Sequence, residues 1–205
     1  MLKRQLINIL GSLHPVGMGY QQFIETDNPF IYRTVKKGAL ILLPGKDAHD
    51  LHFIGRGLFK LYHYNARAEQ LVTGFFGEDS FMMLPNDFYD GSKNETNYLC
   101  ALEDSELLTI CRRDMELIYP RFPESRIHND RIRSKISQGI ADHVILLLAQ
   151  KDDRYGLYAS LHPNIAFRLP GHLLSNHLGI CSKTLNRGKR LFLLGNKGRR
   201  ENFVR

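Results

Sequence analysis

The chain has 205 residues, of which 43% are hydrophobic and 24% charged, and its formal net charge is +7. This length accommodates one large domain and one small one, and the composition is that of an ordinary soluble globular protein. No apolar run approaches the roughly 18 residues that a membrane span requires, and the first residues, MLKRQLINILGSLHP, lack the long apolar core and cleavage site of a signal peptide. A cytoplasmic location is therefore expected.

The three cysteines, Cys100, Cys111 and Cys181, are odd in number and widely spaced. This arrangement argues against a disulfide framework and against a clustered zinc or iron–sulfur site. We therefore expect these cysteines to be small buried hydrophobic residues.

The positive charge is concentrated in the C-terminal part of the chain. Residues 1–122 contain 13 Lys and Arg against 15 Asp and Glu, a net charge of −2, whereas residues 123–205 contain 15 against 6, a net charge of +9. From Tyr155 onward, nine basic residues accompany a single acidic one, Glu201. Such asymmetry predicts a polyanionic partner for this end, although a solvated basic face without a partner would give similar counts.

In chain order, the first predicted element is a helix over residues 1–13, ended by Gly11–Pro15. From Ile31 to about Ile110 the pattern changes to short β-branched or aromatic segments separated by Gly, Asp, Asn or Pro, among them ALILL, DLHFIG, LFKLYHY and QLVTGFF. Several short strands at such intervals predict an antiparallel barrel or sandwich. The segment ALEDSELLTI, Ala101–Ile110, is expected to be its closing hairpin.

A long helix is predicted from about Glu124 to Gln150. Its apolar residues recur at every fourth position, while charged residues lie off this stripe. The stripe consists of Ile132, Ile136, Ile140, Val144 and Leu148. At 1.5 Å per residue the helix is about 40 Å long, which is more than a small barrel covers. We expect the uncovered part to pack against a second copy of the chain across a two-fold axis; packing only against its own barrel is the alternative.

The stretch HLLSNHLGICSKTLNRGKR, His172–Arg190, has the pattern of two short helices joined by a tight turn. A first helix over residues 169–177 would place Leu173, Leu174 and Leu178 inward. Gly179 follows where such a turn requires a positive φ, and Ser182 fits as the N-cap of the second helix. The pattern therefore indicates a helix-turn-helix.

The second of these helices keeps an apolar face, formed by Leu185, Leu191 and Phe192, and presents polar and basic side chains elsewhere. Arg reads guanine bidentately, Asn reads adenine, and Thr and Lys reach phosphates, so a helix of this kind suits the major groove of DNA. The side chains available for this are Lys183, Thr184, Asn186, Arg187 and Arg190. The alternative for each basic residue taken alone is a solvated helix face.

The run GICSKTLNR, Gly179–Arg187, resembles the helix-turn-helix of the cyclic AMP receptor protein and fumarate–nitrate regulator (CRP/FNR) family, in which Thr and Arg follow a turn glycine at these spacings. The stretches DRYGLYASLHPNIAFRLP and NYLCALEDSELL also resemble a branch of that family, and the order of elements agrees over nearly the whole chain. The resemblance implies an α+β fold. Its parts are an N-terminal antiparallel β-barrel of the cyclic-nucleotide-binding, jelly-roll type (residues 1–122), a dimerisation helix (123–150) and a C-terminal helix-turn-helix domain of the winged-helix type (151–205).

The resemblance also implies a sequence-specific transcription regulator that binds a palindromic operator in double-stranded DNA as a homodimer, with RNA polymerase as a further partner. Thr184 would then touch phosphate and Arg187 a base. The rest of the predicted DNA-binding set is Ser182, Lys183, Asn186, Lys189 and Arg190.

Two residues depart from the family's pattern. Lys183 stands where the best-known members carry an acidic residue, so their operator sequence is not carried over. Gly188 stands where an apolar residue is usual, and glycine inside a helix costs about 1 kcal/mol against alanine.

Cyclic AMP is not the expected ligand of the barrel. In the family, a Gly–Glu pair holds the ribose and an Arg–Ser pair holds the cyclic phosphate. Here methionines fall where the ribose glutamate is expected, and a carboxylate or a threonine falls where the phosphate arginine is, which is unfavourable for an anion. The candidate pocket residues are Gly77 and Glu78, Met82 and Met83, and Glu95 and Thr96. A less anionic small-molecule effector, or none, is expected, and no cofactor is predicted.

Metal-dependent or nucleophilic catalysis is not predicted either. His49 and His52, in HDLH, lack the alternate spacing that would point two ligands into one barrel, so surface or loop positions are expected for them. Asp79, Asp87 and Asp90 form no nucleophile–base pattern. Two alternatives stay open: a cupin-like small-molecule or metal-binding enzyme with an incidental basic tail, and a ligand-binding module whose helix-turn-helix contacts protein.

Overall fold

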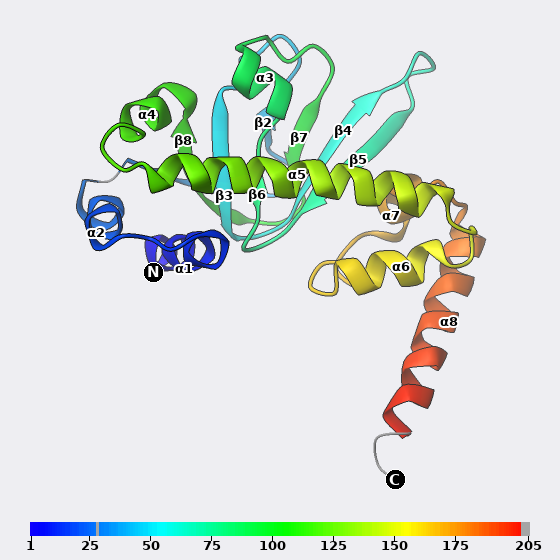
Figure 1. The fold of residues 1–205 in the computed structure, drawn as a ribbon. Coiled ribbons are helices and arrows are strands. Elements are labelled where there is room, and N and C mark those ends of the chain that lie inside the picture. The colour runs from blue at the N-terminus through cyan, green and yellow to red at the C-terminus, as the bar shows by residue number, and fades with distance from the viewer. Residues whose placement is uncertain (28, 202–205) are drawn as a thin grey trace. The chain divides into compact units, whose positions relative to one another are not determined.

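The structure, a computed structural model, describes residues 1–27 and 29–201 (Figure 1). By internal packing the chain divides into two compact units, Met1–Gln138 and a second unit that begins at Gly139. The division falls inside the predicted dimerisation helix, so this helix contributes to both units. The last four residues of the predicted C-terminal domain, 202–205, lie outside the described residues. None of the helices in the described ranges combines the length and the hydropathy needed to cross a membrane.

Two four-stranded antiparallel sheets form the centre of the first unit. The strand order in one sheet is β1 (Ile31–Val35), β8 (Ser105–Cys111), β3 (Asp50–Arg56) and β6 (Phe81–Met82). The order in the other is β2 (Leu40–Leu42), β7 (Tyr98–Ala101), β4 (Phe59–Tyr64) and β5 (Gln70–Phe76). The predicted mixture of helices with antiparallel strands is confirmed, and each quoted segment forms a strand.

One apolar cluster joins the two sheets. Because side chains alternate along a strand, each sheet directs every second residue toward this cluster. Its buried members come from β1, β3, β6 and β8 of one sheet and from β4 and β7 of the other: Val35, Ile54, Met82, Leu107, Phe59, Leu99 and Ala101. Burial of these side chains between the sheets specifies the register of the strands, since a slip by one residue would turn them outward.

The predicted closing hairpin is wrong. β7 pairs with β2 and β4, whereas β8 pairs with β1 and β3, so the turn between them crosses from one sheet to the other. Asp104 in this turn accepts hydrogen bonds from Nζ of Lys36 and from the backbone N–H of Lys37, each at 2.9 Å. These long-range bonds hold the crossing in place, and a pattern of local alternation does not reveal them.

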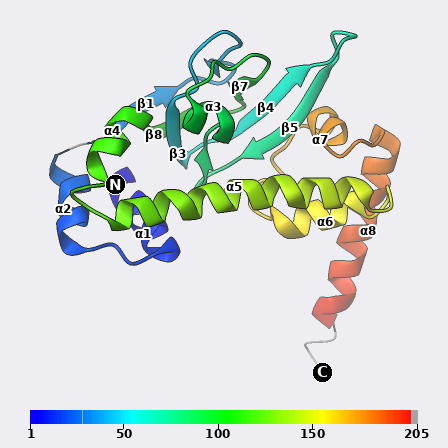
Figure 2. The same cartoon turned by 45° about the horizontal axis from the view of Figure 1, so that its top comes forward.

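Helices cover the outer side of the sheet that contains β3. A second apolar cluster combines β3 and β8 with α1 (Leu2–Leu13), α2 (Met18–Thr26) and α4 (Arg112–Ile118). Figures 1 and 2 show where these helices lie in the first unit. The helix predicted over residues 1–13 is confirmed, whereas α2 and α4 are not foreseen by the sequence patterns. α1 lies so close to β3 that a Cβ on Gly55 would stand 2.0 Å from Cδ1 of Leu2. A side chain at position 55 would therefore displace Leu2 from its present rotamer.

The long helix α5 (Glu124–Leu148) confirms the predicted helix to within two residues at its end. Its first half is joined to the rest of the first unit by buried polar groups. Nε2 of His128 bonds the carbonyl oxygen of His14 at 2.8 Å. Asn129 accepts a hydrogen bond from the hydroxyl of Tyr89, on the short helix α3 (Pro85–Asp90), and donates one to the hydroxyl of Tyr119.

The second unit contains the end of α5 together with α6 (Arg154–Leu161), α7 (Gly171–His177) and α8 (Ser182–Glu201). α8 packs against α6 and α7. The buried hydrophobic residues of α6, α7, α8 and their connections are Tyr155, Tyr158, Ala159, Ile165, Ala166, Leu169, Leu173, Leu174, Leu178 and Leu185. In the described part of the chain no strand follows Cys111, so the β-hairpin of a winged helix is not found there; α8 instead continues to Glu201.

Candidate nucleic-acid interface

α7 and α8 are joined by a turn at Gly179, whose φ of +60° lies in the left-handed region that favours glycine. The N–H of Gly179 bonds the carbonyl of Asn176, and that of Ile180 bonds the carbonyl of Ser175. The prediction of a positive φ at this turn is confirmed. Leu173, Leu174 and Leu178 are buried as expected. The helix begins at Gly171 rather than at Leu169, because the ring of Pro170 disfavours helical backbone at the residue before it.

Arg154, at the start of α6, fixes this turn. Its Nη1 donates to the carbonyl of Leu178 at 2.9 Å and to that of Gly179 at 3.3 Å, while its Nε donates to the carbonyl of Ala149 at 3.1 Å. These are carbonyls at helix ends, which have no partner within their own helix. One guanidinium thus connects the end of α5 to the turn between α7 and α8.

The sequence predicts Ser182 as the N-cap of α8, but in the structure the N-cap is Cys181. Ser182 is already the first helical residue, and the first i to i−4 bond runs from Leu185 N–H to the carbonyl of Cys181. Sγ of the exposed Cys181 lies 3.3 Å from Oγ1 of Thr184. Hydrogen bonds from Thr184 lower the pKa of this thiol. The expectation that the three cysteines are buried is wrong, because Cys181 is exposed and Cys100 and Cys111 are only half-buried.

Leu185 and Gly188 form the inward face of α8, with Phe192 half-buried beside them. A Cβ on Gly188 would lie 3.0 Å from the carbonyl oxygen of Asp152 and 3.1 Å from Cβ of Tyr155. The glycine therefore permits close packing of α8 on the beginning of α6, which explains its presence inside a helix. Leu191, predicted to share this face, is instead 49% exposed.

The predicted DNA-binding residues occupy the first turns of α8 and are mostly open to solvent. Five of them are exposed: Ser182, Lys183, Asn186, Arg187 and Arg190. Thr184 and Lys189 are half-buried, and Nζ of Lys189 lies over the ring of Tyr155, 5.6 Å from its centroid. The structure thus brings three exposed cations to one helix, next to short polar groups that can donate to or accept from a base edge.

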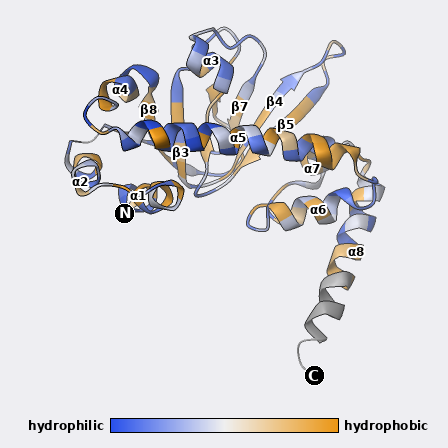
Figure 3. Ribbon diagram, viewed as in Figure 1, coloured by the Kyte–Doolittle hydropathy of each residue, from blue (hydrophilic) through white to orange (hydrophobic). Residues whose placement is uncertain are grey.

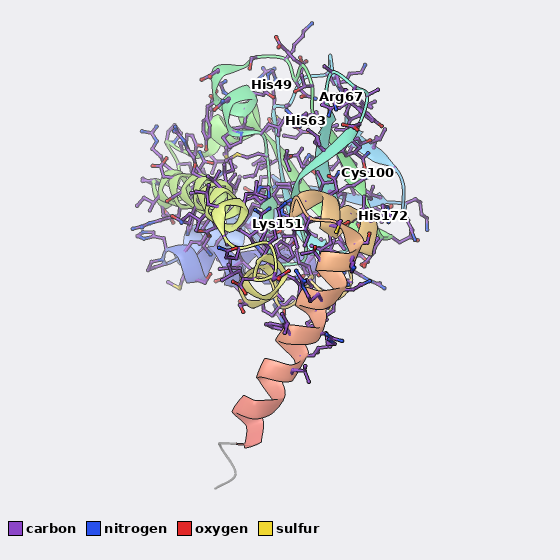
Figure 4. All side chains as sticks on the ribbon, turned by 90° about the vertical axis from the view of Figure 1, so that its right-hand side faces the viewer. His49, His63, Arg67, Cys100, Lys151 and His172 are labelled. Atoms are coloured by element: carbon purple, nitrogen blue, oxygen red, sulfur yellow. The ribbon has the colours of Figure 1, made fainter. Side chains whose placement is uncertain are left out.

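Arg187 is paired with Asp152, a residue absent from the predicted set. Nε of Arg187 donates to Oδ1 of Asp152 at 2.9 Å, and Nη2 donates to the same oxygen. Asp152 lies in the turn between α5 and α6. The residue before it, Lys151, is labelled in Figure 4. Because the two residues are far apart in the sequence, no local spacing reveals the pair.

The first unit contains a small cavity, of about 40 Å³, between its two sheets. Its lining is mainly apolar, with Asp47, Asp50 and His52 as polar members. Nδ1 of the buried His52 lies 2.9 Å from Oγ1 of Thr109, and burial lowers the pKa of this histidine to about 4. A surface or loop position is therefore wrong for His52, which lies on β3 and faces inward. Burial raises the pKa of Asp50, while Arg33 nearby acts in the opposite direction.

Of the six candidate pocket residues, Met82 and Met83 line this cavity. Glu78 does not line it and accepts a hydrogen bond from the backbone N–H of Gly57 at 2.9 Å. Gly77 is buried outside it and accepts a hydrogen bond from Ser80. Glu95 and Thr96 are exposed and lie away from the lining. The apolar part of the lining otherwise comes from Ile41, Leu42, Ala48, Leu61, Phe76, Leu84 and Leu99.

No protein-family model matches the sequence, and no curated protein matches it either. Solved structures do match over most of the chain. A protein assigned to the CRP/FNR family of transcriptional regulators, from Eubacterium rectale, is 15% identical with a TM-score of 0.64, and the match covers 92% of this chain and 88% of that one. FixK2 from Bradyrhizobium japonicum is 14% identical with a TM-score of 0.65, with 82% and 86% of the two chains covered.

A third match is the c-di-GMP-responsive global regulator CLP of Xanthomonas campestris, which is 18% identical with a TM-score of 0.62 over 85% of this chain and 92% of that one. At such identities the likeness is one of fold. It agrees with the resemblance seen in GICSKTLNR and in the order of the elements. The chain therefore has the fold of the CRP/FNR transcription regulators.

Proposed function

We propose that the protein is a sequence-specific, DNA-binding transcription regulator. The observation that carries this proposal is the pair α7 and α8, joined at Gly179, with exposed cations on the first turns of the second helix. The shared fold and the basic excess of residues 123–205 support it. Nothing in the described residues favours the metal-enzyme alternative, since no three His, Cys, Asp or Glu side chains gather there so as to hold an ion.

In this proposal α8 enters the major groove, and its polar side chains have two roles. Arg187 and Asn186 reach base edges, because guanidinium and amide groups form bidentate pairs with guanine and adenine. Thr184, Lys183 and Arg190 contact phosphates and set the register of the helix in the groove. The half-buried Lys189 contributes mainly positive charge.

The regulator acts as a homodimer through α5. The apolar stripe of this helix is covered in its first half, where Ile132 is 3% exposed, and open in its second, where Ile140 is 59%, Val144 53% and Leu148 82% exposed. Figure 3 shows that the residues of the helix are mainly hydrophilic in its first half and more hydrophobic toward its end. Exposed apolar residues repeating every fourth position suit a parallel copy across a two-fold axis. Two recognition helices would then meet half-sites about 34 Å apart.

In this proposal cyclic AMP is not an effector, and the cavity between the sheets would have to enlarge before it held any other small molecule. Small-molecule sites typically measure about 300–1,000 Å³. The cavity of about 40 Å³ is far smaller, and its polar lining includes two carboxylates, Asp47 and Asp50. Control would act by shifting the populations of dimer conformations that fit DNA. RNA polymerase remains a predicted partner.

Selection of bound duplexes from a random DNA pool tests the function directly. The purified chain is incubated with the pool at about 0.15 M salt, where non-specific binding is suppressed, with and without cyclic AMP. An enriched imperfect palindrome with half-sites one helical turn apart, unaffected by cyclic AMP, is the expected result. No enrichment, together with binding that does not depend on salt, would favour the module that contacts protein.

A further inference from the structure

Asp152 and Arg187 form an ion pair that joins the turn before α6 to the proposed recognition helix. Both bonds from the guanidinium, from Nε at 2.9 Å and from Nη2, end on one carboxylate oxygen. The pair lies at the surface, with 39% of the Asp152 side chain and 54% of the Arg187 side chain exposed. A DNA duplex can therefore approach Arg187 while the pair is intact.

The geometry leaves part of the guanidinium open. An arginine side chain has five N–H groups in a planar fork. Two of them, on Nε and Nη2, are directed at Asp152, and the remaining three lie on Nη1 and Nη2 at the tip of the side chain. Guanine presents O6 and N7 side by side in the major groove and needs two parallel donors. The tip of Arg187 still offers them.

Asp152 is itself held by its surroundings. The N–H of Asp153 donates to the carbonyl of Gln150 at 3.0 Å, and Arg154 donates to Ala149 at the start of the same turn and to Leu178 in the turn between α7 and α8. On the opposite side, the absence of a side chain at Gly188 lets α8 approach the carbonyl of Asp152. The backbone of Asp152 is thus held next to α8, which places its side chain within reach of Arg187.

We propose that Asp152 is a positioning residue for base recognition, an inference that rests on the proposed DNA-binding function. Its carboxylate holds Arg187 in one orientation, so less rotamer freedom is lost when the guanidinium meets a guanine. The negative charge of Asp152 also disfavours contact between Arg187 and a phosphate, the contact that dominates non-specific binding. Both effects raise the ratio of affinity for the operator to affinity for other DNA.

The test compares Asp152→Asn with Asp153→Asn. The second variant removes the same charge from an adjacent exposed carboxylate that makes no capping hydrogen bond, so it controls for long-range electrostatics. Dissociation constants are measured by fluorescence anisotropy for a duplex chosen by the random-pool selection and for a scrambled duplex of equal length. Asp152→Asn is expected to lower the ratio of the two affinities about tenfold, within the range of discrimination that one bidentate pair provides. Asp153→Asn is expected to leave the ratio unchanged.

Each other outcome has a defined meaning. An unchanged ratio in Asp152→Asn, with the original chain still selecting its operator, overturns the positioning role and leaves the function standing. Equal falls in both variants overturn it as well, because charge alone would then explain them. If the original chain shows no preference for any duplex, the function fails and the inference with it.

A double-substitution comparison checks that Asp152 acts through Arg187. In an Arg187→Ala background, Asp152→Asn is expected to change the ratio less than twofold, because the group that it positions is gone. Any effect of Asp152→Asn on folding is common to both backgrounds and cancels. A tenfold fall that persists without Arg187 would overturn the inference.

Discussion

The imidazole of His143, near the end of α5, stacks on that of His177 at the end of α7, with ring centroids 4.0 Å apart. Nε2 of His143 also bonds the carbonyl oxygen of His177 at 2.9 Å, and Tyr158 of α6 packs edge-on against the His177 ring. Three helices of the second unit therefore meet at these rings, and the last turns of α5 are structurally part of that unit.

Replacing His143 by alanine should loosen this junction. We expect the free energy of unfolding to fall by about 1–2 kcal/mol, since a hydrogen bond and a ring contact are both lost. Urea denaturation of the whole chain measures the change. The control is His172→Ala, which alters an exposed histidine of α7 that is labelled in Figure 4. It should change the free energy of unfolding by less than about 0.5 kcal/mol. Equal losses of unfolding free energy in the two variants would contradict a stabilising role for the contact between His143 and His177.

Two helical glycines should respond to alanine with opposite signs. No atom lies within 4 Å of a Cβ built on Gly139 of α5, so Gly139→Ala should raise stability by about 0.5–1 kcal/mol through helix propensity alone. A Cβ on Gly188 would press on Asp152 and Tyr155, so Gly188→Ala should lower stability by about 1–3 kcal/mol. Thermal unfolding of both variants measures the two changes in stability. Changes in the same direction would contradict the prediction of opposite signs.

Acid should destabilise the first unit through His52. Burial lowers the pKa of this histidine from 6.5 to about 4, so the unfolded chain binds more protons than the folded one between these values. Stability attributable to His52 is therefore complete above about pH 6.5 and declines as the pH falls toward 4, by on the order of 3 kcal/mol.

Urea unfolding at about pH 7 and about pH 4.5 measures this loss. In His52→Gln the difference between the two conditions should shrink. It should not vanish, because burial also lowers the pKa of His128. A difference as large in His52→Gln as in the original chain would refute the assignment to His52.

Dimerisation should depend on the second half of α5. Val144→Glu places a charge in the middle of the exposed stripe, where burial of an unpaired carboxylate is costly, so the variant should sediment as a monomer at concentrations at which the original chain is a dimer. Gln138→Glu introduces the same charge on an exposed residue of the opposite face of the helix and is the matched control. If Val144→Glu forms dimers of unchanged affinity, this face of α5 is not the dimer interface.

Arg187 and Lys189 should differ in their effect on DNA binding. Arg187→Ala is expected to relax sequence preference, by about 1–3 kcal/mol at the base pair that it reads. Lys189→Ala should weaken binding to all sequences nearly equally and reduce the salt dependence, because it removes a positive charge but no contact with a base. The same loss of preference from both substitutions would rule out Arg187 as the base reader.

Much of the fold follows from local sequence patterns. β3, β4 and β5 occur where short β-branched or aromatic runs are bounded by turn residues, and α5 occurs where apolar residues recur every fourth position. Gly179 has the positive φ that its place between two apolar runs requires. In each case the signal lies within one turn of helix or a few residues of strand.

The features that the sequence patterns do not predict mostly depend on contacts between residues that are distant in the chain. The segment Ala101–Ile110 is expected from its sequence to be a hairpin, yet it holds only the last residue of β7, a turn and most of β8, and these two strands pair in different sheets. The environment of His52 depends on Thr109 across the sheet, and that of Arg187 on Asp152 across two helices. The N-cap differs by one residue because a thiol, Cys181, takes the place where a hydroxyl is the usual choice.

The contact between Leu2 and Gly55 has an evolutionary consequence. A Cβ at position 55 would overlap the Leu2 side chain at 2.0 Å, although 52 residues separate the two positions in the chain. The two sites should therefore change together across descendants of this sequence: alanine at position 55 should be found more often with a smaller side chain at position 2, because Leu2 must otherwise leave its present rotamer.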